Sequence, residues 1–184
     1  PELHQILQRF KDPENRRLQV FQESNALPKD TIYFAEEILP GESRKSWHSR
    51  AISALEEAQL VFLDPDTGLK DDSDSKYARH DEVAEYYQKG KTVLVIQFFH
   101  GGRYWKCKEE DRISEYVASR IQKSMGIFKS YDNSILQMPI VRGRENPILF
   151  FTLAQPNHAR LLTKALHEFS KHNFMVSLID WQDH

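Results

Sequence analysis

The run KTVLVIQFF, residues 91–99, constrains the fold more than any other part of this sequence. It is rich in β-branched and aromatic side chains, which predicts a strand. Both faces of that strand would be apolar, and such a strand belongs in the centre of a sheet that is covered on both sides. The chain therefore needs helices that can cover each face of a sheet.

Helical and strand-like segments alternate along the rest of the chain. Short apolar or alternating runs predict strands, and apolar side chains three and four residues apart predict helices. The expected strands are residues 16–24, 31–38, 59–64, 91–99, 134–141, 147–154 and 174–180. The expected helices are residues 2–10, 43–58, 80–88 with a C-cap at Gly90, a long helix around 113–121 that Gly126 ends, and a helix that Asn157 caps. This order predicts an α/β fold, with a Rossmann-like, mostly parallel sheet covered by helices and an antiparallel pair near its C-terminal end.

Length and composition fit a single domain, which we expect to span residues 1–184. Apolar residues make up 40% of the chain and charged residues 28%, which excludes disordered and fibrous classes. A net charge of −2 gives no global basic field, so a nucleic-acid surface would have to be a local patch. The chain begins at Pro1 rather than Met, which is consistent with upstream elements that this sequence does not include.

The single cysteine, Cys107, excludes an intrachain disulfide framework and a cysteine-cluster metal site, and it suits a reducing cytosol. No apolar run approaches the roughly 20 residues needed to cross a bilayer, and no leader resembles a secretory signal. We therefore expect a cytoplasmic protein without a membrane partner. The sequence does not fix an oligomeric state.

Two carboxylates follow directly after a predicted buried strand, in VFLDPDTGLK. Asp64 and Asp66 flank Pro65, and Thr67 and Gly68 come next. Ligands of open parallel sheets bind beyond the carboxyl ends of the strands. The next predicted strand ends with Gln97, Phe98, Phe99, His100, Gly101, Gly102 and Arg103. If the two strands are neighbours, the two loops face each other across one cleft.

The residue types in these loops suggest two interpretations. In the first, the carboxylates accept hydrogen bonds or bind a metal, His100 acts as an acid or base, and Arg103 clamps an anion. In the second, an Asx-type turn caps the strand, Gly68 supplies a positive backbone angle, and His100 is solvated.

Other candidates are weaker. Asp71, Asp72 and Asp74 could extend a cation site, although a solvated acidic loop is favoured. Lys76 and Tyr77 would close over the cleft or begin the next helix, and Arg142 and Arg144 would touch phosphate or form a solvated turn. The eight histidines lack the paired spacing of a zinc site.

The element order and the strand-end acids resemble the second half of class I S-adenosylmethionine-dependent methyltransferases. The closest type methylates the N6 amine of adenine in ribosomal RNA or DNA. In that family the fourth strand ends in Asp-Pro-Pro-Tyr or Asn-Pro-Pro-Tyr, the fifth strand follows one helix later, and a hairpin-like pair completes the sheet. LVFLDPDT stands at the motif and KTVLVIQFF at the fifth strand. The resemblance makes residues 16–23 and 31–38 the second and third strands.

The resemblance also implies roles for individual residues. Asp64 would accept a hydrogen bond from the amine of a flipped base, and Pro65 would aim its carbonyl at the same amine. Asp66 replaces the second proline and Thr67 the stacking aromatic, so Tyr77 or Phe98 would have to stack on the base. Thr67, Gly68, Gln97 and Arg103 would line the substrate side. S-adenosylmethionine would be the cofactor, with Glu23 as its contact, but no glycine-rich loop occurs among the seven glycines.

Three alternatives stay open. DPDTG nearly matches the Asp-x-Asp-x-Thr motif of haloacid dehalogenase phosphatases, with Asp64 as nucleophile, Asp66 as acid and base, and Mg²⁺ beside them. A nuclease would place Asp66 and Gln97 around a metal. A non-enzymatic module would bind nucleic acid or a protein through the same cleft. VFLDPDTGL also resembles the segment FLDPDNGL of uncharacterised bacterial proteins, which implies no activity.

Overall fold

The structure, a computed structural model, describes residues 12, 18–24, 26–71, 76–98, 110–132, 136–137, 140–142, 148–171 and 176–178. The chain groups into two compact units, Pro1–Glu57 and Ala58–His184, where the sequence predicts one domain. The helix expected at residues 2–10 lies outside the described residues.

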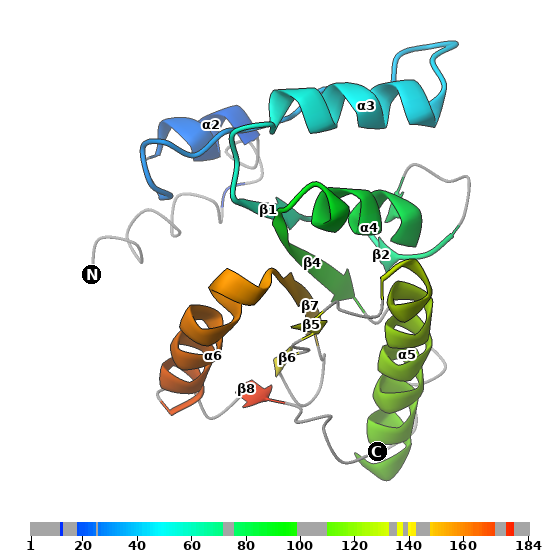
Figure 1. Cartoon of the computed structure of the whole chain (residues 1–184), viewed down its shortest axis with the longest axis vertical. Coiled ribbons are helices and arrows are strands. Elements are labelled where there is room, and N and C mark those ends of the chain that lie inside the picture. Colours follow the sequence, from blue (N-terminus) through cyan, green and yellow to red (C-terminus); the bar gives the residue numbers. More distant parts are fainter. Residues whose placement is uncertain are drawn as a thin grey trace. The chain divides into compact units, whose positions relative to one another are not determined.

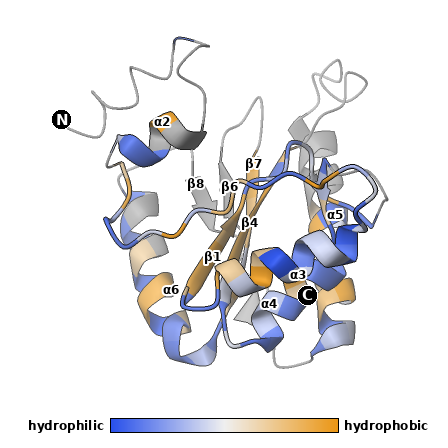
Figure 2. Ribbon diagram, turned by 90° about the horizontal axis from the view of Figure 1, so that it is seen from above, coloured by the Kyte–Doolittle hydropathy of each residue, from blue (hydrophilic) through white to orange (hydrophobic). Residues whose placement is uncertain are grey.

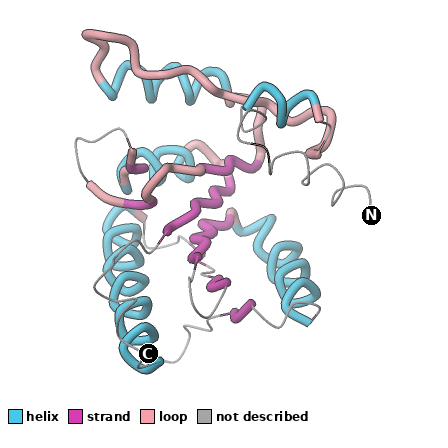
Figure 3. The backbone as a smooth tube through the Cα atoms, turned by 180° about the vertical axis from the view of Figure 1, so that it is seen from behind, coloured by secondary structure: helices cyan, strands magenta, loops and turns pink. Residues whose placement is uncertain are grey.

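The first unit contains helices α2 (Leu18–Glu23) and α3 (Arg44–Ala54). Ser43 caps α3 by accepting a hydrogen bond from the backbone N–H of Ser46 at 3.1 Å. Figure 3 shows no strand in the described part of this unit. The helix predicted at residues 43–58 is thus confirmed, although it ends four residues early.

Both strands predicted in the first unit are wrong. Residues 18–23 form α2, because Leu18 and Phe21 are three residues apart and satisfy helical spacing as well as alternation. Residues 31–38 form no ladder. Side chains of α3 hold this segment instead: the indole N–H of Trp47 donates to Glu36 O at 2.7 Å, and the rings of Phe34 and Trp47 are 5.8 Å apart.

The second unit is built on one mixed sheet with the strand order β1-β4-β7-β6-β8. Its strands are β1 (Leu60–Leu63), β4 (Thr92–Phe98), β6 (Ile140–Arg142), β7 (Ile148–Ala154) and β8 (Val176–Leu178), and β5 (Leu136–Gln137) also pairs with β7. β1 runs parallel to β4, with Leu60 opposite Thr92 and Leu63 opposite Val95. β4 pairs antiparallel with β7, and β6 pairs antiparallel with both β7 and β8.

The α/β class is therefore confirmed, whereas a mostly parallel sheet is not. Among the described strands of this sheet, only β1 and β4 run parallel. The antiparallel pair predicted near the C-terminal end is present as β6 and β7, and β7 lies directly beside β4. As a result, each described pairing from β4 to β7 and onward to β5, β6 and β8 is antiparallel. The sequence does not reveal this, because apolar and polar residues alternate in the same way in parallel and antiparallel strands.

Helices cover both faces of this sheet. Figures 1 and 2 show α6 (Pro156–Lys171) on one side and α4 (His80–Gln88) with α5 (Glu110–Tyr131) on the other. The hydrophobic strands in Figure 2 lie between helices whose outer faces are hydrophilic. The fully buried side chains include Val83, Val93, Val95, Ile121, Phe128, Leu149, Phe151 and Leu153. The run KTVLVIQFF thus forms the covered central strand that it predicts.

The helix ends depart from the predictions in two places. α5 passes through Gly126 and ends at Tyr131, because a helix interior tolerates a glycine at a cost of only about 1 kcal/mol. α6 begins at Pro156, so Asn157 lies inside its first turn rather than at the cap. α4 has its predicted bounds, and Gly90 after it has a φ of 80°.

Polar contacts fix the start of β4 between α4 and α6. The hydroxyl of Thr92 accepts from the backbone N–H of Gln155 at 3.1 Å and lies 2.9 Å from Nδ1 of His158. The amide of Gln155 donates to Tyr87 O at 2.7 Å and to Lys91 O at 3.2 Å. β4 is therefore anchored at the end opposite Gln97.

No helix in the described part of the chain is long and apolar enough to cross a membrane.

Candidate functional site

The candidate site is the segment that follows β1, residues 64–71, which we call the acidic loop. β1 and β4 are parallel neighbours, as the sequence predicts, so their carboxyl ends meet at one edge of the sheet. Gly68 and Leu69 form a short strand, β2 (Gly68–Leu69), which pairs in parallel with β3 (Tyr77–Ala78). The acidic loop is therefore not a free turn, because it follows the β1–β4 ladder directly and its own residues 68 and 69 pair with β3.

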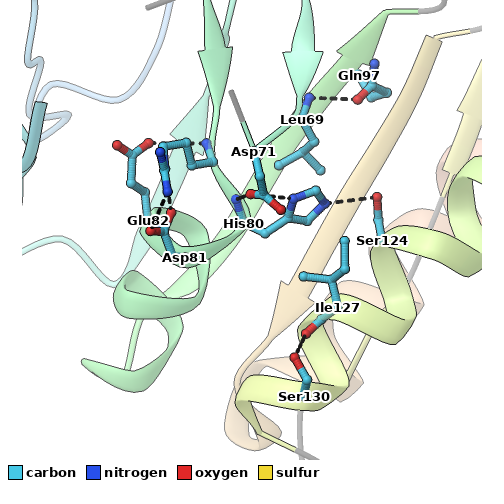
Figure 4. A network of polar contacts seen from close by, with 10 residues as sticks. Leu69, Asp71, His80, Asp81, Glu82, Gln97, Ser124, Ile127 and Ser130 are labelled. Carbon is cyan, nitrogen blue, oxygen red and sulfur yellow. Dashed lines mark hydrogen bonds and ion pairs between the residues drawn. The ribbon is translucent and has the colours of Figure 1, made fainter. Parts of the chain in front are cut away.

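Gln97, near the end of β4, holds the acidic loop from the sheet. Its side chain is buried, and its Oε1 accepts from the backbone N–H of Leu69 at 2.7 Å (Figure 4). Its Nε2 donates to Phe98 O at 2.7 Å and to Thr67 O at 3.3 Å. The sequence places Gln97 in contact with a substrate; in the structure its amide is committed to backbone groups.

Gly68 is required by this contact. Its φ is 107°, a conformation that residues with a Cβ rarely adopt. A Cβ at this position would also lie 2.5 Å from Cδ and 2.6 Å from Oε1 of Gln97. The prediction that Gly68 supplies a positive backbone angle is confirmed, and the close approach of Gln97 is a second reason for glycine.

Thr67 holds the other side of the loop. Its backbone N–H and its hydroxyl both donate to Lys76 O, at 3.1 Å and 2.9 Å. The pairing places Tyr77 opposite Gly68 in the β2–β3 ladder. The ammonium of Lys70 lies 4.9 Å from the centroid of the Tyr77 ring, in a cation–π contact. Tyr77 is thus the predicted aromatic residue that the structure brings to the loop.

The carboxylates of Asp64 and Asp66 are exposed on this fixed backbone. No side chain in the described part of the chain hydrogen-bonds or ion-pairs with either of them. Partial desolvation raises the pKa of Asp64, and the negative charge of Asp66 raises it further. The loop therefore presents two acceptors to solvent, one of which holds its proton more tightly than an ordinary Asp.

The C-terminal end of the loop is fixed by a buried histidine. Oδ1 of Asp71 is 3.0 Å from both the backbone nitrogen and Nδ1 of His80, the first residue of α4 (Figure 4). Nε2 of His80 lies 3.2 Å from the hydroxyl of Ser124 in α5. The rings of His80 and Phe128 are 5.1 Å apart.

Burial and hydrogen bonding have opposite effects on the pKa values of Asp71 and His80. Burial lowers the pKa of His80, although the hydrogen bond and charge of Asp71 act in the raising direction. Burial would raise the pKa of Asp71, but hydrogen bonds from the backbone and ring of His80 outweigh it and lower that pKa. Both shifts favour a neutral His80 beside an ionised Asp71. The sequence interpretation of Asp71 as a solvated acid or cation ligand misses this contact, because pairing with a side chain nine residues later depends on the tertiary structure.

The structure does not place several predicted site residues at the acidic loop. Side chains alternate along β4, so Phe98 points to the opposite face from Gln97. Glu23 ends helix α2 in the first unit, not a strand. Arg142 ends β6, where it pairs with Ile148 and Val176. His100, Gly101, Gly102 and Arg103 lie outside the described residues, as do Asp72, Asp74, Cys107 and Arg144. The second wall of the cleft therefore stays a prediction.

Two features expected of an S-adenosylmethionine site are not found among the described residues. Glu23 lies on a helix, and the described glycines, Gly41, Gly68, Gly90 and Gly126, do not cluster in a loop. Within the described residues, no group of three or more His, Cys, Asp or Glu could hold a metal ion. No family model, curated protein or solved structure matches the chain.

Proposed function

We propose that this chain is a methyltransferase-like, Rossmann-like protein whose acidic loop recognises the exocyclic amine of a nucleic-acid base. The arrangement of strands supports the resemblance. The strand that Asp64 follows, β1, lies parallel to the strand one helix later, and the hairpin of β6 and β7 continues the sheet beside β4.

The observation that carries the proposal is the state of Asp64. Its carboxylate is exposed and has no partner among the described side chains, while Gln97 and Thr67 fix the backbone around it. A preformed acceptor loses little conformational freedom on binding, so more of its interaction with a ligand appears as affinity. An exocyclic amine has two N–H groups, and an ionised carboxylate is an acceptor only. The two are therefore matched.

The neighbours of the loop suit a base with its phosphates. Tyr77 lies opposite Gly68, and a base stacked on an aromatic side chain contributes about 1–3 kcal/mol. Lys70, whose ammonium lies over the Tyr77 ring, and Lys76 are both exposed, and each can pair with a phosphate of the nucleic-acid backbone.

S-adenosylmethionine would supply an electrophilic methyl group, and the described residues do not provide its binding half. The proposal therefore covers recognition of the base amine by the acidic loop. Transfer of a methyl group would depend on residues outside those described. Isothermal calorimetry with S-adenosylmethionine tests this part separately. Heat of binding would support methyl transfer, and silence would leave base recognition as the function.

The main test is fluorescence anisotropy with two single-stranded oligonucleotides that differ in one base. One carries adenine and the other carries purine, which lacks the 6-amino group. We expect the wild-type protein to bind the adenine probe about tenfold more tightly, as a hydrogen bond to a charged group predicts. Asp64→Ala should abolish this preference, and Asp66→Ala serves as the matched control that keeps it.

The pH dependence gives a second criterion. The preference requires ionised Asp64, and its pKa is raised, so the preference should disappear at a higher pH than the ordinary value of 3.8 implies. Equal binding of both probes, or binding of neither, would refute base-amine recognition. A melting temperature that rises with Mg²⁺ in the wild type but not in Asp64→Ala would favour the metal-dependent alternative instead.

A further inference from the structure

Asp71, His80 and Ser124 form a chain of hydrogen bonds that runs from an exposed carboxylate into the core and that the proposed recognition step does not use. His80 is 4% exposed and Ser124 8% exposed. The residues come from three separate elements: the end of the acidic loop, the first turn of α4, and the middle of α5 (Figure 4). A buried polar group that is fully hydrogen-bonded selects one arrangement of the elements that carry it.

The order carboxylate, imidazole, hydroxyl is that of a nucleophilic triad, but the position of Ser124 does not suit catalysis. A nucleophilic serine needs access to substrate and backbone N–H groups that can stabilise an oxyanion. Ser124 lies in the interior of α5, where N–H groups bond to carbonyls one turn earlier. Its burial also keeps it from substrate. The chain of contacts therefore acts on the loop and not on a reaction.

The hydrogen bonds determine which nitrogen of His80 carries the proton. An ionised Asp71 can only accept, so its contact at 3.0 Å requires a proton on Nδ1 of His80. Nε2 of the neutral ring is then an acceptor, and the hydroxyl of Ser124 donates to it. The backbone N–H of His80 adds a second donor to the same Asp71 oxygen. Asp71 thus accepts from the first backbone N–H of α4 and places a negative charge near the positive end of the helix.

We propose that His80, as the neutral Nδ1–H tautomer, is a positioning residue that sets the conformation of the acidic loop. Gln97 holds the loop at Leu69, and His80 holds it two residues later at Asp71. Between these points the backbone N–H of Lys70 donates to Ala78 O at 3.0 Å. These contacts fix the C-terminal part of the acidic loop, residues 69–71, against β3, β4 and α4, directly after Gly68. The inference rests on the proposed function for its purpose, though not for its geometry.

Nitrogen-15 NMR of the wild-type protein tests the tautomer directly. We expect the His80 ring at pH 7 to show a protonated Nδ1 and an unprotonated Nε2. The opposite tautomer would overturn the proposal, since Asp71 could then not be held by the ring. This measurement needs neither a variant nor a ligand.

Two substitutions then distinguish the Nδ1 contact of His80 from its Nε2 contact. His80→Asn places an amide near the position of Nδ1 and can still donate to Asp71, whereas His80→Gln places its amide near Nε2 and reaches only Ser124. We expect His80→Gln to reduce hydrogen-exchange protection of the Leu69 and Lys70 amides about tenfold, and His80→Asn to retain it. Equal protection in both variants would overturn the proposal.

The same pair distinguishes this inference from the proposed function. If His80→Gln also weakens binding of the adenine oligonucleotide while His80→Asn retains it, the loop conformation matters for recognition. If the wild type does not bind the oligonucleotide but the exchange difference is present, the positioning role stands and base recognition fails. If the oligonucleotide binds equally to both variants while protection differs, the link between His80 and recognition is refuted.

Discussion

The contact between Gly68 and Gln97 makes a quantitative prediction about stability. Gly68→Ala places a Cβ at a φ of 107° and within 2.6 Å of three atoms of the Gln97 amide. The unfavourable backbone conformation costs about 1–2 kcal/mol. Gln97 must also move, which leaves the buried N–H of Leu69 without its acceptor at a cost of about 1–3 kcal/mol. We expect a total loss of about 2–5 kcal/mol in the free energy of unfolding.

Gly90→Ala is the matched control. Gly90 has a φ of 80°, and a Cβ there would meet no atom of the described residues within 4 Å. This substitution should cost only the backbone share of about 1–2 kcal/mol. Urea denaturation followed by circular dichroism measures both variants. The reasoning would be refuted if Gly68→Ala were no more destabilising than Gly90→Ala, because the clash with Gln97 would then carry no energy.

A double-mutant cycle extends this test. Gln97→Ala removes the side chain that the new Cβ would meet, so Gly68→Ala should cost less in that background by about 1 kcal/mol or more. Strict additivity of the two substitutions would show that the residues do not interact. The cycle therefore isolates the contact from the backbone strain of position 68.

Further predictions concern the core and the titrating groups of the second unit. Thr152 is 2% exposed, and its hydroxyl has no hydrogen-bond partner among the described residues. Thr152→Val should therefore raise the free energy of unfolding by about 1 kcal/mol in urea denaturation, and a lower free energy of unfolding would contradict this reasoning. Phe128 is fully buried against His80 and Phe151, and Phe128→Ala should cost about 3–5 kcal/mol in the same assay. The lowered pKa of Asp71 stabilises the fold above the unfolded value of 3.8, and this stabilisation is lost as pH falls through the lower folded pKa. The lowered pKa of His80 adds a second loss of folding stability, which begins as pH falls below the unfolded value of 6.5. The free energy of unfolding should therefore decline with falling pH from 6.5 through the acid range. Asp71→Asn should make this decline shallower below pH 3.8.

The second unit follows local patterns closely enough that much of it is predictable from sequence. The run of residues 91–99 fixes the central strand, and the polar boundaries of residues 59–64 fix its parallel neighbour. α4 has its predicted bounds because helix-forming residues end at a glycine with positive φ. What the sequence does not indicate is the direction of strand pairing beyond β4, since alternation is the same for parallel and antiparallel neighbours.

In the first unit, local sequence patterns predict the secondary structure poorly. An alternating pattern in residues 16–24 fits a strand and a helix equally well over so few residues, and α2 forms there. Residues 31–38 have strand-like composition, yet they are held by Trp47 and by Arg50, which hydrogen-bonds to Glu37 O at 3.5 Å. Tertiary contacts of this kind override propensity, because a strand requires a partner that local sequence cannot specify.

In the candidate site, too, residues with a local sequence signal are predictable, and residues whose roles depend on tertiary contacts are not. Asp64, Asp66 and Gly68 are identifiable because a turn after an apolar run is a local signal. The roles of Gln97 and His80 are not, since each depends on a side chain meeting backbone from another element. Gln97 looks like a polar residue that awaits a ligand, and only the structure shows that its hydrogen-bonding groups are already used.

The fit of Gln97 beneath Gly68 has a consequence for how this sequence can vary. A side chain at position 68 requires a smaller residue at position 97, and a smaller residue at 97 removes the acceptor of the Leu69 N–H. The two positions are therefore expected to change together in related chains, and to do so through intermediates of reduced stability. Gly90 has the same sign of φ without a neighbour, so its replacement by Asn or Asp needs no second change. Two glycines with similar backbone angles thus differ in how freely each can be replaced over time.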